Sequence, residues 1–350
     1  MVLLPPDKKR RDGVKNMGYI PTTPIAFAMV FITMLCWASW ANTMKKCGNW
    51  RFEGFYWDYA WSIVLWTLLL AVTLGGISHL GWQPNNFFDS LKNINLSAFL
   101  WASFAGFVWG IGNILLVAAI ALTGFSIAFP LGLGLALVLG TFLAFITNPA
   151  ATHRPLFLFV GLIFVTLAII ANGIAYRIKE KKIKGNKYFK KGLIVTILCG
   201  ILISLFPFPF NYAFKSGLNG YGATLFMTLG AFVSTLVVLP IIMKRPLIPG
   251  QRPIGISEYL RAKPSWHGWA VLAGLIWAVG TTFNLVVASQ PTFSVAIAYT
   301  LGQCATMVAA LWGIFVWKEF KGAPSKSYLY LGVMFALFIL GIISLANATG

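Results

Sequence analysis

The sequence predicts an all-α polytopic membrane protein of ten transmembrane helices, arranged as two inverted five-helix repeats. The first observation is composition: 58% of the 350 residues are hydrophobic and 10% are charged, which is outside the range of soluble proteins. The second is that ten apolar runs approach the length of about 20 residues that a bilayer requires. The third is an internal repeat. Together these observations predict two copies of one membrane unit.

The ten apolar runs are separated by polar segments. They cover 24–42, 57–77, 97–121, 126–146, 155–176, 192–214, 222–243, 268–289, 294–316 and 327–347. Very short connections join the third run to the fourth and the eighth to the ninth. Each of these two pairs is therefore expected to form an antiparallel hairpin.

The repeat relates segment 105–134 to segment 273–302, which lies 168 residues further along the chain. The identical pairs are Ala105/Ala273, Gly106/Gly274, Trp109/Trp277, Gly112/Gly280, Phe125/Phe293, Ser126/Ser294, Ala128/Ala296 and Gly134/Gly302. An offset near half the chain length indicates duplication. Because each half has an odd number of spans, the second half runs inverted. We divide the chain into a basic tail (1–23), a first repeat (24–176), a basic linker (177–191) and a second repeat (192–350).

The net charge of +19 lies in segments between the apolar runs, so it indicates orientation in a lipid bilayer rather than a nucleic-acid partner. Of the 27 Lys and Arg residues, 19 fall on the side that carries the linker, and the other eight, five of them in the tail, fall on the opposite side. We expect the linker in the cytoplasm and both termini outside. The four cysteines have neither metal-ligand nor disulfide spacing and are expected to pack as small buried side chains.

Ionisable residues are scarce. We expect none of the eight acids near the middle of a span, and the three histidines lie in loops or at span ends. The sequence contains no metal-ligand cluster, phosphate loop or paired carboxylates, so it predicts neither an enzyme nor a bound metal or cofactor. A path without a buried counter-charge favours a neutral polar solute over an organic cation.

Tryptophan and amide side chains recur at matched places in the two halves. Indole faces stack on sugars or heterocycles, and amides both donate and accept hydrogen bonds. We therefore predict a solute site between the repeats, formed by Trp37, Trp40, Asn42, Trp109, Asn113, Asn211, Trp277, Asn284 and Gln303. The alternative for each amide is a hydrogen bond between helices or a helix cap.

Pro207 and Pro209 lie inside the sixth apolar run, where each removes a backbone donor. They predict either a simple kink or a broken helix beside the site. Gly106, Gly110 and Gly274 are spaced for close helix packing, which is our interpretation of them.

Two acids lie in the aromatic stretch RFEGFYWDYAW at the start of the second span. Asp58, or otherwise Glu53, is the candidate for proton coupling, since partial burial raises a carboxyl pKa toward a useful range. The alternative is an interfacial acid paired with Arg51, Lys45 or Lys46.

Several stretches resemble the L-rhamnose–proton symporter branch of the drug/metabolite transporter superfamily. They are WRFE and WDYAW in segment 50–61, WGIGN (109–113), GLGLALVLGT (132–141), FKKGLIVTILCGI (189–201) and WKEF (317–320). YWDYAW (56–61) also resembles the ureide permeases, and the overall plan is similar to the glucose/ribose porters. FPFPFN in the sixth span and AYTLGQCATM in the ninth depart from the symporter pattern, so rhamnose itself is not implied.

The resemblance implies ten helices in two inverted repeats, a multi-pass location in the bacterial cytoplasmic (inner) membrane, and import of a small neutral solute by alternating access. We expect a secondary transporter for a sugar or similar solute, coupled to protons. An exporter of drugs or metabolites and a non-transporting receptor or scaffold are the alternatives. The sequence leaves open whether the protein is a monomer or a dimer.

Overall fold

The computed structural model describes residues 23–76, 86–92, 94–123, 127–179, 189–248 and 250–349. Every regular element in these ranges is a helix. Residues 1–22 of the predicted tail and 180–188 of the predicted linker lie outside the described residues, as do Phe125 and Ser126 of the repeat.

Nine helical spans among the described residues are long and apolar enough to cross a membrane, which confirms the predicted all-α membrane class. The first five in chain order are α2 with η1 (Thr23–Ser39, Trp40–Lys46), α3 (Phe52–Val72), α5 (Leu96–Thr123), α8 (Pro155–Lys179) and α9 with α10 (Phe189–Ser204, Pro209–Lys215). The other four are α11 (Gly220–Lys244), α13 (Pro264–Ala288), α14 with α15 and η4 (Val295–Gln303, Ala305–Leu311, Trp312–Val316) and α16 (Ser325–Ala348).

The predicted fourth span corresponds to a shorter apolar helix, Leu131–Thr147. It combines the end of the π-helical segment η2 (Ala128–Leu133) with α7 (Gly134–Thr147). The count of ten membrane-spanning helices therefore stays a prediction. The remaining elements are short: α4 (Phe87–Lys92), η3 (Pro149–Ala151) and α12 (Ile256–Leu260).

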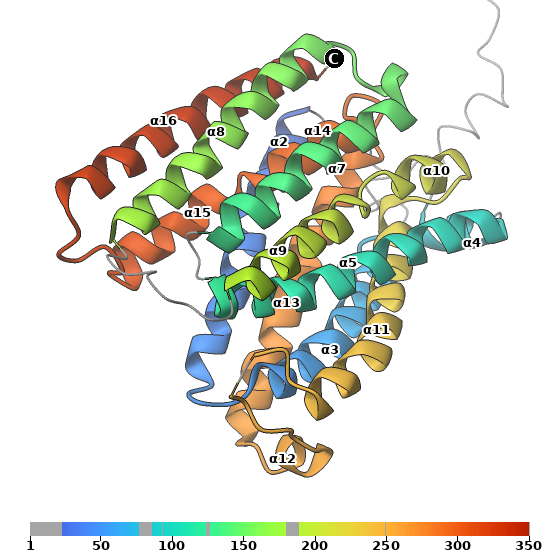
Figure 1. The fold of residues 1–350 in the computed structure, drawn as a ribbon. Helices are drawn as coiled ribbons and strands as arrows, with labels where there is room; N and C mark the ends of the chain where they lie inside the picture. The colour runs from blue at the N-terminus through green and yellow to red at the C-terminus, as the bar shows by residue number, and fades with distance from the viewer. Residues whose placement is uncertain are drawn as a thin grey trace, which may run out of the picture.

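The helices pack in corresponding pairs. α8 lies along α16 at one side of the molecule (Figure 1). In the numbering of the ten predicted spans, α5 is the third, and it packs against α11 (the seventh) and α9 (the sixth). In the same way α13, the eighth, packs against α3 (the second) and α2 (the first). These are the partners that two five-helix repeats would have, and the repeat itself stays a prediction.

Glycines allow the closest of these approaches. A Cβ at position 106 would overlap the backbone carbonyl of Met227 on α11, and one at position 274 would overlap the Ser62 hydroxyl on α3. A Cβ at position 110 would likewise meet Ser234 on α11. Small residues of this kind let membrane helices approach backbone to backbone. The three predicted glycines thus face helix contacts rather than a cavity.

Two spans are interrupted. The sixth breaks at 205–208, between the end of α9 and the start of α10 at Pro209. The ninth changes from α14 to α15 and then to the π-helical segment η4. Backbone freed inside a membrane is tolerated where it borders protein or a cavity, and π segments are frequent at functional sites. Both interruptions border the cavity described next.

Candidate functional site

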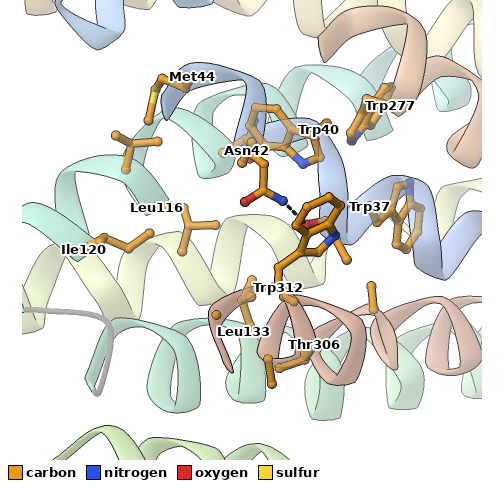
Figure 2. A pocket seen from close by; sticks show the side chains of 18 of the residues that line it. Trp37, Trp40, Asn42, Met44, Leu116, Ile120, Leu133, Trp277, Thr306 and Trp312 are labelled. Carbon is orange, nitrogen blue, oxygen red and sulfur yellow. Dashed lines mark hydrogen bonds between the residues drawn. The ribbon is translucent and has the colours of Figure 1, made fainter. Parts of the chain in front are cut away.

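A cavity of about 480 Å³ is lined by residues from both the N-terminal and the C-terminal parts of the chain, between positions 37 and 319. Side chains from α2 and η1, α5, α8, α9, α13 and the ninth span line it, and Figure 2 shows many of them pointing into one space. This volume lies within the usual range for small-molecule sites, about 300–1,000 Å³. The cavity is large enough for a small metabolite.

Indole rings dominate the wall. The lining tryptophans are Trp37, Trp40, Trp109, Trp277, Trp312 and Trp317. The ring centroids of Trp109 and Trp277 lie 4.5 Å apart, with the ring planes inclined by 35°. Helix-to-helix hydrogen bonds hold two other rings: the Trp37 indole N–H donates to Thr281 Oγ1 at 2.9 Å, and that of Trp312 donates to Ser39 Oγ at 2.9 Å.

Seven of the nine predicted site residues line the cavity: Trp37, Trp40, Asn42, Trp109, Asn113, Trp277 and Gln303. Asn211 and Asn284 do not line it. Asn211 Nδ2 donates to the Ala144 carbonyl on α7 at 2.7 Å, and Asn284 Nδ2 donates to the Ala298 carbonyl on α14 at 2.8 Å. These two amides connect helices, which was the alternative considered for each of them.

A polar network surrounds one end of the cavity. Glu319 Oε2 accepts a hydrogen bond of 2.7 Å from the Tyr176 hydroxyl, and its Oε1 lies 3.2 Å from Lys45 Nζ. The Lys45 ammonium lies 4.1 Å from the centroid of the Trp317 ring, and the Trp317 indole N–H donates to Asn42 Oδ1 at 2.8 Å. The side chains of Lys45 and Glu319 are 43% and 29% exposed, so this end is the mouth of the cavity.

The sequence pattern placed Glu319 in a loop, and its position at the mouth comes from a tight turn. Lys318 adopts the left-handed conformation (φ 50°), and the Glu319 N–H donates to the Gly313 carbonyl at 2.8 Å. The chain after η4 therefore folds back, which brings the carboxylate over the cavity. The WKEF motif was the available signal, but it indicated a family rather than a location.

Asn172 on α8 was also missed. It lines the cavity, is 4% exposed, and its Oδ1 accepts no hydrogen bond from the described residues. A single amide in an apolar span gives no periodic signal, so only the packing of α8 identifies it.

The opposite end is closed by contacts between α7 and α14. The hydroxyl oxygens of Thr141 and Thr300 lie 2.8 Å apart, and the Tyr299 hydroxyl donates to the Ala136 carbonyl at 3.1 Å. The Tyr299 ring also meets Phe206 edge-on, with centroids 5.3 Å apart. All of these side chains are buried, and Phe206 also lines the cavity, so the α7–α14 contact is a tightly packed boundary beside it.

The proton-coupling candidates lie outside the cavity wall, near the start of α3. Asp58 is 2% exposed and accepts hydrogen bonds from Trp61 Nε1 at 3.0 Å and the Tyr259 hydroxyl at 2.6 Å. Its Oδ2 lies 2.5 Å from His267 Nδ1. Asp58 therefore joins α3 to α12 and α13, and none of the basic residues suggested for it is its partner.

Tyr259 is the donor in this cluster that lies outside the spans. Burial, the hydrogen bond to Asp58 and the negative charge of that carboxylate together raise the pKa of Tyr259 to about 12. It is therefore a neutral donor at physiological pH. Glu53, the second candidate, is held by the guanidinium of Arg51 through two nitrogen–oxygen contacts, as the alternative interpretation of an interfacial acid predicts.

Within the described ranges, no group of three or more His, Cys, Asp or Glu side chains is placed to hold a metal ion. The chemistry of the cavity is thus that of aromatic faces, amides and one ion pair at its mouth.

Comparison with known proteins decides the family. The model of the family described as sugar transport protein matches residues 85–347. The chain belongs to this sugar transport family. The nine candidate membrane spans among the described residues are therefore those of a multi-pass permease.

The relatives of this protein include ureide permeases and sugar uptake proteins. Ureide permease 1 of Arabidopsis thaliana is 25% identical, over 93% of this chain and 97% of the relative. The glucose uptake protein GlcU of Bacillus subtilis is 26% identical, over 71% of this chain and 80% of the relative. The putative sugar uptake protein YxfA of Lactococcus lactis is 24% identical, over 74% of this chain and 82% of the relative. The predicted resemblance to ureide permeases and sugar porters is confirmed.

A solved crystal structure of another protein has the same fold. It superposes with a TM-score of 0.59 at 16% sequence identity, and covers 92% of this chain and 96% of the other. The similarity extends over almost the whole length of both chains.

Proposed function

We propose that this protein is a secondary transporter that imports a small neutral polar solute, a sugar or a ureide, by alternating access coupled to protons. The observation that carries the proposal is the cavity of about 480 Å³. Both halves line it, it has an exposed mouth, and buried contacts between α7 and α14 close its other end. A cavity closed at one end only is what one state of an alternating-access cycle requires.

The charge of the wall supports a neutral solute. The two charged side chains among the lining residues, Lys45 and Glu319, pair with each other at the mouth. Deeper in the cavity, indole rings and the amides of Asn113, Asn172 and Gln303 remain to contact the solute. Aromatic faces with amides suit the rings and polar edges of sugars and ureides. The named relatives, ureide permeases and glucose uptake proteins, carry the same two classes of solute.

The corresponding helix pairs support two inverted repeats that move against each other. In that arrangement the α7–α14 contact separates as the mouth closes. We propose a bacterial cytoplasmic membrane as the location of the protein, as the resemblance implies. The Lys and Arg count supports an orientation in which the mouth opens to the cytoplasm and both termini lie outside. The observed state then faces inward, ready to release an imported solute.

We assign proton coupling to Asp58 and its partner His267. The pair ties α3 to α13, the helix that supplies Trp277 to the cavity wall. Adding a proton to the carboxylate removes its charge and weakens the contact with His267. The packing of α3 against α13 then depends on whether Asp58 carries a proton, and a coupling site requires such a dependence.

The direct test is uptake by purified protein in liposomes. Radiolabelled D-glucose and the ureide allantoin would be offered with and without a proton gradient, acidic on the side of solute entry. We expect accumulation of one class that collapses when a protonophore is added, and none in empty liposomes. Gradient-driven movement out of the vesicle lumen would instead indicate an exporter. Binding without flux would indicate a receptor or scaffold.

A further inference from the structure

We infer that Asn172 is the residue that selects the solute, by accepting a hydrogen bond from a hydroxyl or N–H group of the bound molecule. This inference rests on the proposed function and extends it to one atom of the cavity wall. Asn172 lines the cavity, and its buried Oδ1 has no hydrogen-bond donor among the described residues.

An acceptor in this state is unusual. Most buried side-chain polar atoms in native proteins have a partner, and one left without a partner costs free energy. Other buried polar atoms that lack a partner among the described residues, such as the Tyr59 hydroxyl and Thr282 Oγ1, belong to residues that do not line the cavity. Asn172 does line it. A ligand that donates a hydrogen bond to Asn172 Oδ1 would remove this free-energy cost and would therefore bind more tightly.

Two of the other amides in the wall are engaged within the protein. Asn42 donates to the Ala38 carbonyl and accepts from the Trp317 indole. Asn113 Nδ2 donates to the Tyr56 hydroxyl at 3.1 Å. These contacts orient the amides and reduce what they offer to a solute. The Oδ1 acceptor of Asn172 has no such contact with the described residues.

Its position also suits recognition. Asn172 and Tyr176 are four residues apart on α8, so they share one face of the helix, and both line the cavity. Tyr176 holds Glu319 at the mouth, which places Asn172 about one helical turn deeper. A solute that has passed the ion pair therefore meets this amide next.

The chemistry selects molecules with a donor at one fixed place. A sugar hydroxyl and a ureide N–H both satisfy it, and an analogue that lacks only that donor leaves the buried carbonyl unpaired. Sites built to bind a hydroxyl or N–H group reject such analogues strongly, because the unpaired group is the one the protein cannot rehydrate.

The test combines protein variants with solute analogues, using full-length purified protein and calorimetric Kd values. The probes are D-glucose with its monodeoxy series and allantoin with its N-methyl series. In the wild type we expect one analogue of the bound class to lose about 10- to 100-fold in affinity. Asn172→Leu, similar in shape, should lose the same factor for the parent solute and show no further loss with that analogue.

Thr282→Val is the matched control. Thr282 is 1% exposed, its Oγ1 also lacks a partner among the described residues, and it does not line the cavity. Its Kd and its ranking of analogues should equal those of the wild type. Asn172→Ala is a second deletion, in case the leucine prevents folding.

Three results would overturn the inference. One is a wild-type Kd in the folded Asn172 variants, and another is the same analogue ranking in those variants as in the wild type. The third needs only the wild type: all analogues of the bound class binding within about twofold of the parent. If the wild type binds and transports neither class, the proposed function fails and this inference fails with it.

Discussion

The indole rings of Trp109 and Trp277 meet in the cavity wall, with centroids 4.5 Å apart and planes inclined by 35°. The two residues occupy matched positions of the repeat, 168 residues apart, on α5 and α13. Each half of the chain thus supplies one ring to a shared aromatic surface in the wall.

Removing either ring should weaken solute binding. We expect Trp109→Ala and Trp277→Ala each to raise the Kd of the transported solute about tenfold, because the aromatic face and its buried area are lost. Calorimetry on purified protein measures this. Trp101→Ala is the control, since Trp101 stacks on Tyr212 and does not line the cavity. Equal affinities for all four proteins would contradict the site.

Replacing the coupling carboxylate should separate binding from accumulation. We expect Asp58→Asn to abolish proton-driven accumulation in liposomes while exchange of labelled for unlabelled solute continues, because the amide does not titrate. Asp89→Asn removes a carboxylate from an exposed ion pair with Lys92 and should leave both activities intact. Gradient-driven uptake that persists in Asp58→Asn would exclude Asp58, and the same measurement on Glu53→Gln would then test Glu53.

The Tyr259–Asp58 contact should add to stability only below strongly alkaline pH. The folded-state pKa of Tyr259 is about 12 against an ordinary value of 10.0, so this contribution is complete below about pH 10. It is lost as pH rises through about 12. The melting temperature of the wild type should therefore fall more steeply between pH 10 and 12 than that of Tyr259→Phe, which lacks the titrating group. Parallel curves would show that the contact does not contribute.

Locking the closed end should stop transport without stopping binding. Because the hydroxyls of Thr141 and Thr300 lie 2.8 Å apart, cysteines at both positions are placed to form a disulfide. The background would carry alanine in place of Cys36, Cys47, Cys199 and Cys304. We expect oxidation to reduce uptake at least about tenfold at unchanged Kd, and reduction to restore it, if α7 and α14 must separate in each cycle. Full uptake by the cross-linked protein, with either single-cysteine variant as reference, would argue against this movement.

The helix contact at Gly106 should tolerate no side chain. Since a Cβ there would overlap the Met227 carbonyl, we expect Gly106→Ala to cost about 1–3 kcal/mol of stability and to lower the melting temperature. Gly332→Ala on α16 is the matched control, because nothing lies within 4 Å of a Cβ at that position. Equal melting temperatures would mean that α5 and α11 can move apart without cost.

Much of this architecture could be predicted from the sequence, because the bilayer constrains it so strongly. Apolar runs of fixed length predicted the spans, and the repeat predicted that Trp109 and Trp277 belong to the same site. The fourth span was harder to predict, since its helix is short and begins in a π-helical segment.

The site was predictable only in part. Trp109, matched in the repeat, and Asn113, one helical turn from it, were predicted and do line the cavity. Asn211 and Asn284 look the same in the sequence, but each bonds a carbonyl of a neighbouring helix instead. Periodicity gives the face of a helix that a residue occupies, and it does not give what lies against that face.

The sequence by itself determined the membrane class, the approximate spans and the family, because these follow from hydrophobicity and motifs along the chain. Only the tertiary structure decided that Glu319 folds back to Lys45 and Tyr176 and that Asp58 pairs with His267. It also decided that Asn172 lines the cavity while its Oδ1 has no donor among the described residues. The first two features are contacts between residues more than a hundred positions apart, and the third depends on which side chains surround Asn172. Such contacts are set by how helices pack, which no local pattern specifies.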